Sequence, residues 1–365
     1  MSEVYYSSIF SELTKQVQAR IDAASELRKR LFDQNVYERF LEWDTPTVGF
    51  NFEEIIGSYN LSVAAATLDS KGKEPIMGTE GLATIAKKVL IHQMTLPMPI
   101  EDYRKVLQLL DSRMISDQAK KQQLVNLMWG GVERVVESVQ AKIDIIFLGA
   151  LSNKGVFSFT QENNPEGGVR GNIDYGMPQE NIATADTQWT EGNIDTVDVF
   201  EDIQGVVDAA QEKVTFDRIL LDQKRLSYIL RSKKMKQVIF GTDKSSSPLL
   251  LANLNEFMRS NGLPVFEVIR RMTRIQDNGK IREYKPWNDK SLVFVPEGRL
   301  GVIKNAYADN ELRPEPGVAY SNYGRIRISQ WGKGETDNSN GVEAQSISLP
   351  VITEINGIYS LSVES

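Results

Sequence analysis

The sequence predicts an α+β fold built around one long helix, with an extended two-stranded segment before it and a mixed region after it. Apolar residues recur at three- and four-residue steps in residues 8–42 and 116–151, which is the period of an amphipathic helix. Short apolar runs bounded by Gly and Pro, typical of strands, fill residues 47–97 and most of the chain after residue 264. Both periods occur in one chain, so we expect a mixed α+β protein.

The length and composition are those of an ordinary globular protein, and the chain is long enough to form substantial hydrophobic cores. The 365 residues are 41% apolar and 25% charged, and no run of eighteen apolar residues predicts a membrane span. The first residues lack the basic-then-apolar pattern of a signal peptide, so we expect no secretion by that route. The absence of Cys excludes disulfides and thiolate sites. The net charge of −7 argues against a general nucleic-acid binder.

The first hundred residues predict an arm and an excursion. Residues 8–42 read as an amphipathic helix or pair, which needs an apolar surface of this subunit or of a neighbour to lie on. Strand-like pieces at Thr47–Phe52 and Asn60–Ala66 then lead to a polar tip at Ser70–Gly81, and an extended segment returns to Pro97. A two-stranded hairpin is marginal alone in water, so we expect this one to lie on another subunit.

The long helix, from about residue 116 to 151, is the strongest single signal. It would span about 50 Å, more than a compact domain of ordinary size needs. Gly130–Gly131 in its middle predict a bend. Gly149 and Gly155 predict its end.

The rest of the chain alternates between helices and strands. A short strand at residues 172–175 is stopped by Gly176 and Pro178. Residues 291–306 predict two strands about a Pro-Glu-Gly turn, and Asn278–Gly279 predict a hairpin. The other expected segments are helices at 193–213, 223–234 and 247–262, and strands at 216–222, 238–241, 264–275, 281–287, 324–331 and 346–364.

No pattern of catalytic residues stands out. His92 is the only histidine, so a nucleophilic triad or a zinc site would have one imidazole at best, and a structural or surface role is favoured. The chain contains neither G-x-S-x-G nor G-x-x-x-x-G-K-[ST]. Carboxylates are plentiful, but no spacing selects a pair for acid–base work. The sequence favours a structural protein over an enzyme, and we expect no cofactor or metal.

Charge is separated along the second half of the chain. Residues 171–212, the acidic block, hold ten acids and no Lys or Arg; the candidate contact residues among them are Asp195, Asp198, Glu201 and Asp202. Residues 224–236, the basic block, hold no acid and six bases: Lys224, Arg225, Arg231, Lys233, Lys234 and Lys236. The basic block could contact nucleic acid, but it lacks interleaved aromatic residues. A charge opposed to a helix dipole, or a partner for another subunit's acids, explains it more simply.

The order of these features resembles the major capsid proteins of tailed phages, of the lambda head-protein type with the Hong Kong ninety-seven fold. The motifs that carry the resemblance extend over nearly the whole chain. They are "TVGFNFEEIIGS" (47–58), "ERVVESVQAKIDIIFLGAL" (133–151), "IDYGMP" (173–178) with Trp189 downstream, "YKPWNDKSLVFVPEGRLGVI" (284–303) and "LPVITEINGIYSLSV" (349–363).

The resemblance implies a division into five parts. These are an N-terminal helical arm (1–45), an extended β-hairpin loop (46–100), a peripheral domain (101–188) with a spine helix (116–151), an axial α/β domain (189–318), and C-terminal strands (319–365) that return to the peripheral domain. Gly176 and Pro178 would form the hinge between the two domains. The tip of the extended loop departs from the family pattern. Lys71 and Lys73 lie there as candidate inter-subunit contacts, and nothing marks an acceptor for a covalent crosslink.

The resemblance also implies a function. We expect the chain to form pentamers and hexamers of an icosahedral shell around the double-stranded DNA of a tailed phage, with non-specific DNA contact on the inner face and no membrane. Scaffold, portal and decoration proteins would be partners, with assembly in the host cytoplasm. We expect the acidic block of one axial domain to face the basic block of the next, so that reversing Lys233 and Lys234 impairs ring assembly.

Two alternatives stay open at this point. One is an encapsulin-type compartment shell of the same fold, which encloses cargo enzymes. The other is an α/β enzyme with an unrecognised carboxylate pair.

Overall fold

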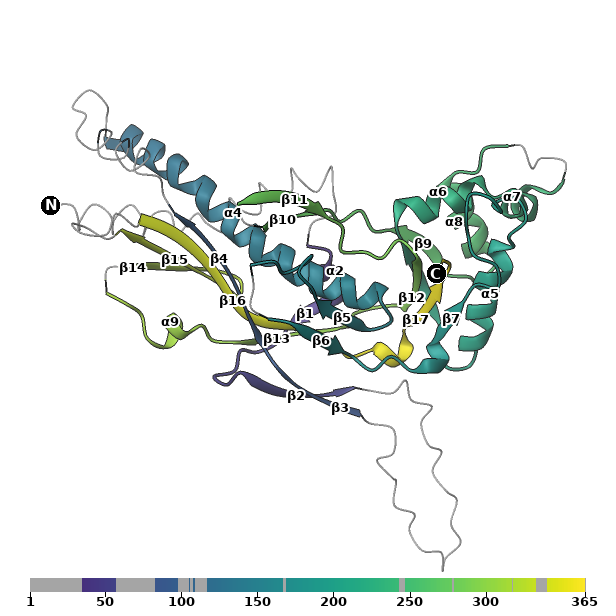
Figure 1. The fold of residues 1–365 in the computed structure, drawn as a ribbon, viewed down its shortest axis with the longest axis horizontal. Helices are drawn as coiled ribbons and strands as arrows, with labels where there is room; N and C mark the ends of the chain where they lie inside the picture. Colours follow the sequence, from purple (N-terminus) through teal and green to yellow (C-terminus); the bar gives the residue numbers. More distant parts are fainter. Residues whose placement is uncertain are drawn as a thin grey trace, which may run out of the picture.

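The computed structural model describes residues 35–56, 83–97, 105, 108, 117–166, 169–242, 247–277, 279–316, 318–332 and 340–364. Most of the predicted arm, the tip of the excursion and the predicted strand at Asn60–Ala66 lie outside these residues. The described part is elongated, with the long helix α4 (Asp117–Ser152) at one end and a group of shorter helices at the other (Figure 1).

The secondary structure is mixed, as predicted. The other described helices are α2 (Tyr37–Phe40), α5 (Val199–Ala210), α6 (Gln223–Arg231), α7 (Lys233–Phe240), α8 (Leu251–Ser260) and α9 (Asp309–Leu312), with 3-10 turns at Gln179–Asn181 and Ile355–Gly357. The strands are β1 (Leu41–Trp43), β2 (Asn51–Ile56), β3 (Ala83–Lys88), β4 (Leu90–Pro97), β5 (Val156–Phe159), β6 (Gly171–Asp174), β7 (Ile182–Thr184), β8 (Phe216–Leu221), β9 (Val265–Val268), β10 (Thr273–Asp277), β11 (Lys280–Tyr284), β12 (Ser291–Pro296), β13 (Gly301–Ala306), β14 (Val318–Tyr323), β15 (Ile326–Gly332), β16 (Asn340–Ile352) and β17 (Tyr359–Ser362).

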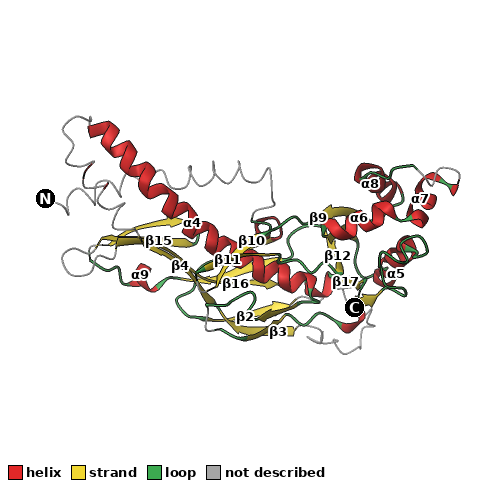
Figure 2. Ribbon diagram, turned by 45° about the horizontal axis from the view of Figure 1, so that its top comes forward, coloured by secondary structure: helices red, strands yellow, loops and turns green. Residues whose placement is uncertain are grey.

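The first core lies between α4 and a six-stranded sheet. The sheet has the order β1-β13-β16-β15-β14, and β4 pairs with β16 in addition. The apolar stripe of α4 is buried as the helical period predicts: Val132, Val135, Val136, Val139, Ile143, Ile146 and Phe147. Figure 2 shows the helix lying along the sheet.

Two glycines of α4 permit close packing and neither ends the helix. The helix is continuous through Gly130–Gly131, where the sequence predicts a bend, and the bend stays a prediction. A Cβ at Gly131 would lie 3.1 Å from Val342 Cγ1, so glycine lets the helix approach the sheet. The predicted end at about residue 151 is confirmed, because α4 ends at Ser152 and Gly155 follows with a φ of +79°; Gly149 itself lies inside the helix. A Cβ at Gly149 would lie 2.7 Å from the Phe157 ring, which packs on the helix there.

The second core lies between a five-stranded sheet and the helices α5 to α8. The sheet has the order β7-β17-β12-β8-β9 (Figure 1). All six residues of β12 are buried. Leu292 and Phe294 face the second core, whereas Val293 and Val295 face the first. Because successive side chains of a strand point to opposite faces, β12 contributes side chains to both cores.

Tertiary structure corrects several local predictions. The predicted helix at 223–234 is two helices, because the Ser232 hydroxyl accepts a 3.3 Å hydrogen bond from Met235 N and begins a new helix, α7. The predicted strand at 238–241 is the end of α7. Residues 41–43 form β1 and are not helical, because they pair with β13. The predicted strand at 264–275 is divided between β9 and β10, which belong to different sheets. The hairpin β10–β11 is confirmed.

The sheets do not follow the predicted domain boundaries along the chain. β12 and β13, predicted as two strands about a turn, belong to different sheets. β13 falls in the predicted axial range but pairs with β16, and β17 falls in the C-terminal range but pairs with β12. The division into arm, extended loop and two domains stays a prediction.

A buried ion pair joins three distant segments inside the first core. Asp144 of α4 is fully buried, and its Oδ2 lies 2.8 Å from Nε of the buried Arg271. Its Oδ1 accepts a 2.9 Å hydrogen bond from Tyr37 N, where the arm joins the body. Burial raises the pKa of Asp144, and the Arg271 charge opposes that rise.

We predict that Asp144→Ala lowers the free energy of unfolding by about 3–5 kcal/mol, because it leaves the Arg271 guanidinium buried without a counter-charge. Chemical denaturation of the unassembled subunit measures this loss. The exposed Glu297→Ala is the matched control, with an expected change within about 0.5 kcal/mol. The combination Asp144→Ala with Arg271→Met should recover part of the loss. An unchanged midpoint for Asp144→Ala alone contradicts the assignment.

Candidate subunit-contact site

The described residues contain no arrangement suited to catalysis by a metal. No three His, Asp or Glu side chains among them are placed to hold an ion. His92 of β4 is buried, and burial, with the Lys142 charge as the second cause, lowers its pKa to about 4. The imidazole is therefore neutral at pH 7 and has a structural setting. None of the described helices has the length and apolar character of a membrane span.

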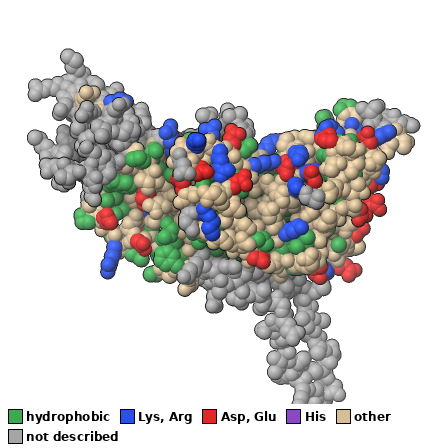
Figure 3. All heavy atoms as spheres, in the orientation of Figure 1, with side chains coloured by type: hydrophobic (Ala, Val, Ile, Leu, Met, Phe, Trp, Pro, Cys, Tyr) green, Lys and Arg blue, Asp and Glu red, His purple; other side chains and the backbone are tan. Residues whose placement is uncertain are grey.

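The four candidate residues of the acidic block lie at the start of α5. Asp198 is the N-cap, and its carboxylate accepts a 3.2 Å hydrogen bond from Glu201 N. Asp202 accepts a 2.7 Å hydrogen bond from Trp189 Nε1, and partial burial raises its pKa. Asp195 and Glu201 are exposed. Acidic side chains gather at the end of the molecule that carries α5 (Figure 3).

Most of the basic block pairs with acids of its own chain. Lys224 Nζ lies 2.9 Å from Asp289, and Lys234 Nζ lies 3.4 Å from Asp198. The Arg231 guanidinium contacts both carboxylate oxygens of Glu191, at 2.6 and 3.2 Å. We had expected these bases to face a neighbouring subunit. Within the described residues, only Lys233 and Lys236 of the block form no ion pair, and both lie on α7.

Arg225 has an internal position that the sequence did not predict. Its side chain is 2% exposed and forms an ion pair with Glu364 near the C-terminus. Its Nη1 donates a 2.9 Å hydrogen bond to the Trp189 carbonyl, and its Nε donates to the carbonyl of Asp289. The Trp189 ring stacks on Tyr228 with centroids 5.7 Å apart. Arg225 is therefore a buried residue that links α6 to residues 189, 289 and 364, and we remove it from the candidate contact residues.

Sequence spacing contained no signal for these contacts. Arg225 and Glu364 are 139 positions apart, and the partner atoms at residues 189 and 289 belong to the backbone. Only the fold brings them together.

The predicted hinge links the two cores. Gly176 has φ of +72°, a conformation that favours glycine, and its N–H donates a 2.8 Å hydrogen bond to Asp174 Oδ1. Pro178 precedes the short turn into β7 of the five-stranded sheet. A hinge motion there stays a prediction. Lys71 and Lys73 lie outside the described residues.

We predict that Glu364→Gln lowers stability at pH 7 and that the difference from wild type shrinks as the pH falls below about 4.5. The Arg225 side chain lowers the pKa of Glu364 from its ordinary value of 4.5. A carboxylate with a lowered folded-state pKa stabilises above the unfolded value and loses that contribution as it is protonated. Denaturant midpoints at pH 7, 5 and 4 measure the difference. Glu297→Gln serves as control, and a difference that is independent of pH contradicts the ion pair.

Comparison with known proteins supports the predicted resemblance. The family described as "Phage major capsid protein E" matches residues 90–363. No curated protein matches. A crystal structure of a prophage protein of Escherichia coli CFT073, titled as its capsid protein, has a TM-score of 0.59 at 14% identity and covers 96% of this chain and 98% of its own. This likeness confirms the predicted capsid fold.

More distant similarities have lower scores. The capsid of a native GTA particle has a TM-score of 0.49 at 12% identity, with 92% of each chain covered. The SrpI encapsulin of Synechococcus elongatus PCC 7942 has a TM-score of 0.35 at 10% identity, covering 92% of this chain and 89% of its own. Neither score carries an argument about function.

The family match extends over both sheets and both cores, far more than half of the chain. The chain therefore belongs to the phage major capsid protein E family, and it is a structural protein of the capsid shell, not an enzyme.

Proposed function

We propose that this chain forms the pentamers and hexamers of an icosahedral head that encloses the double-stranded DNA genome of a tailed phage. The observation that carries the proposal is the family match over residues 90–363. The hairpin of β2 and β3 supports it. This two-stranded sheet extends from the body (Figure 1), and such a hairpin needs further packing to be stable in water. A neighbouring subunit would supply that packing.

The proposed location and partners follow from the shell. Members of a capsid family reside in the virion, and assembly would take place in the host cytoplasm. A scaffold protein, a portal protein and a decoration protein are proposed partners. With a net charge of −7, contact of the shell with DNA would be weak and non-specific.

We also propose that adjacent second cores meet through opposite charges around each ring. Lys224, Arg231 and Lys234 pair with acids of their own chain. Lys233 and Lys236 on α7 remain for a neighbour's Asp195 and Glu201, of which both are exposed. Exposed pairs contribute only about 0.2–1 kcal/mol each. Repeated around a closed ring, such contributions sum and steer the head-to-tail approach.

We predict that Lys233→Glu with Lys236→Glu raises the protein concentration needed for ring or shell formation by about tenfold or more, because attraction becomes repulsion at every interface. The monomer should fold as before, since both side chains lie outside the second core. Electron microscopy and light scattering over a concentration series measure the effect.

The matched control is Lys233→Arg with Lys236→Arg, which keeps both charges and should assemble normally. Shells formed by the Glu variant at the wild-type concentration would disprove the proposed contact. Electron microscopy also tests the wider function. DNA-filled particles from infected cells support it, whereas particles that enclose protein cargo identify a compartment shell.

A further inference from the structure

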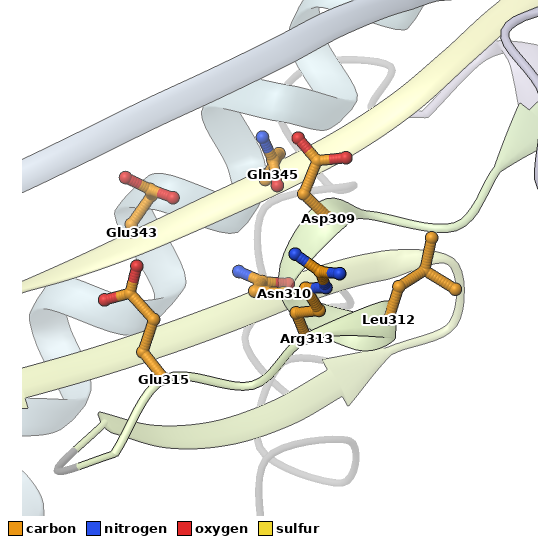
Figure 4. Close-up of a pocket in the computed structure, with 7 residues that line it drawn as sticks. All are labelled: Asp309, Asn310, Leu312, Arg313, Glu315, Glu343 and Gln345. Atoms are coloured by element: carbon orange, nitrogen blue, oxygen red, sulfur yellow. The ribbon is translucent and has the colours of Figure 1, made fainter.

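A polar pocket of about 500 Å³ opens on the face of the six-stranded sheet that points away from α4. The α9 segment borders it on one side and β16 on the other (Figure 4). Its lining residues are Asp309, Asn310, Leu312, Arg313, Glu315, Glu343 and Gln345.

The alternation of β16 explains why the pocket lies on this face. Val342 points toward α4, where its Cγ1 lies 3.1 Å from the position of a Cβ at Gly131. Glu343 and Gln345 therefore point to the opposite face. Across the strand pair, Thr95 is in register with Glu343, and Gln93 with Gln345. Thr95 and Gln93 of β4 therefore lie next to the lining residues Glu343 and Gln345.

The pocket carries an excess of negative charge with apolar edges. Three lining carboxylates, Asp309, Glu315 and Glu343, face one base, Arg313. Glu343 Oε2 is held by hydrogen bonds from Gln93 Nε2 at 2.7 Å and Thr95 Oγ1 at 3.1 Å. In Figure 4 the Glu315 side chain points toward β16, on which Glu343 lies.

One large exposed apolar side chain lines the pocket, and a second lies farther along the neighbouring strand β4. Leu312 lines the pocket and is 51% exposed, and Ile91, which shares the outer face of β4 with Gln93 and Thr95, is also 51% exposed. A surface of this composition fits a basic segment flanked by apolar residues.

We propose that this pocket binds the arm of a second copy of the chain at Arg28, Lys29 and Arg30. These residues are the only run of three consecutive bases in the sequence, and Leu27, Leu31 and Phe32 flank them. Three bases flanked by apolar residues match the three lining carboxylates and the exposed Leu312 beside them. The first 34 residues precede the described body and are available as the occupant.

The path of the chain favours a second copy over the subunit's own arm. The arm joins the body beside α4, where Tyr37 N donates to Asp144. The pocket lies on the opposite face of the sheet from Val342, which packs against α4 near Gly131. Gly131 and Asp144 are thirteen residues apart, which corresponds to about 20 Å along the helix. Arg28 lies seven residues before Asn35, and the helix that the sequence predicts there would span only about 10 Å over that length.

The inference rests on the proposed shell function, and charge reversal in two separate variants tests it. The pocket variant carries Asp309→Lys and Glu315→Lys, and leaves Glu343 with its hydrogen bonds. The arm variant carries Arg28→Glu, Lys29→Glu and Arg30→Glu. Each variant alone should fail to form shells at the wild-type concentration. An equimolar mixture should assemble, because each arm then meets an oppositely charged pocket on the other copy.

The mixture of the pocket variant and the arm variant can either support or overturn docking between copies. Restored shells support docking between copies. If the mixture fails but one chain carrying all five substitutions assembles, the arm occupies its own pocket and the proposal is overturned. If either variant assembles alone, the contact is also rejected. Circular dichroism of each variant confirms that the subunit is folded.

A binding measurement separates this inference from shell formation. A fluorescent peptide of residues 24–34 is titrated with the full-length arm variant, whose own arm cannot compete. We expect binding that weakens at least tenfold when the pocket substitutions are added, and that weakens as NaCl is raised from 50 to 500 mM. A peptide of residues 66–80 is the control. Shells without peptide binding overturn only the pocket, whereas binding without shells overturns only the proposed function.

Discussion

The structure depends on β12, a strand buried on both faces between two cores. Leu292 and Phe294 pack among the helices α5 to α8, while Val293 and Val295 pack toward α4. β8 shares this role, with Leu220 in the first core and Ile219 and Leu221 in the second. A strand buried on both faces has no solvent-facing side, which explains the apolar run "LVFVP" after Ser291. The two cores are therefore joined by two common strands, β8 and β12, as well as by the chain segments that link them.

Buried charges fasten the remaining segments to this frame. Asp144 and Arg271 tie the start of the described chain and the segment before β10 to α4. Arg225 ties the C-terminal Glu364 and the backbone at Trp189 and Asp289 to α6. Such groups are costly to bury and costly to break singly. This arrangement holds both ends of the described body against its helices.

The surface then divides between charges satisfied within the subunit and charges open to partners. Ion pairs with Glu191, Asp198 and Asp289 neutralise much of the basic block within the subunit. The acids beside α9 on the outer sheet face have one base among them. The contacts proposed at these surfaces would be weak individually and would contribute to assembly through their sum.

The sequence by itself determined the periodic features: the long helix, confirmed at Asp117–Ser152, the hairpin β10–β11, and the family motifs in their order. These depend on local spacing and on turn residues, which a linear chain displays directly. Only the tertiary structure decided the sheet to which each strand belongs, the division of residues 223–240 at Ser232, and the burial of Arg225. It also assigned Lys234 and Arg231 to partners in their own subunit. The physical reason is that strands and charges pair with residues that are distant in the sequence or lie on another element. The linear pattern does not encode which of several suitable partners lies nearest in space.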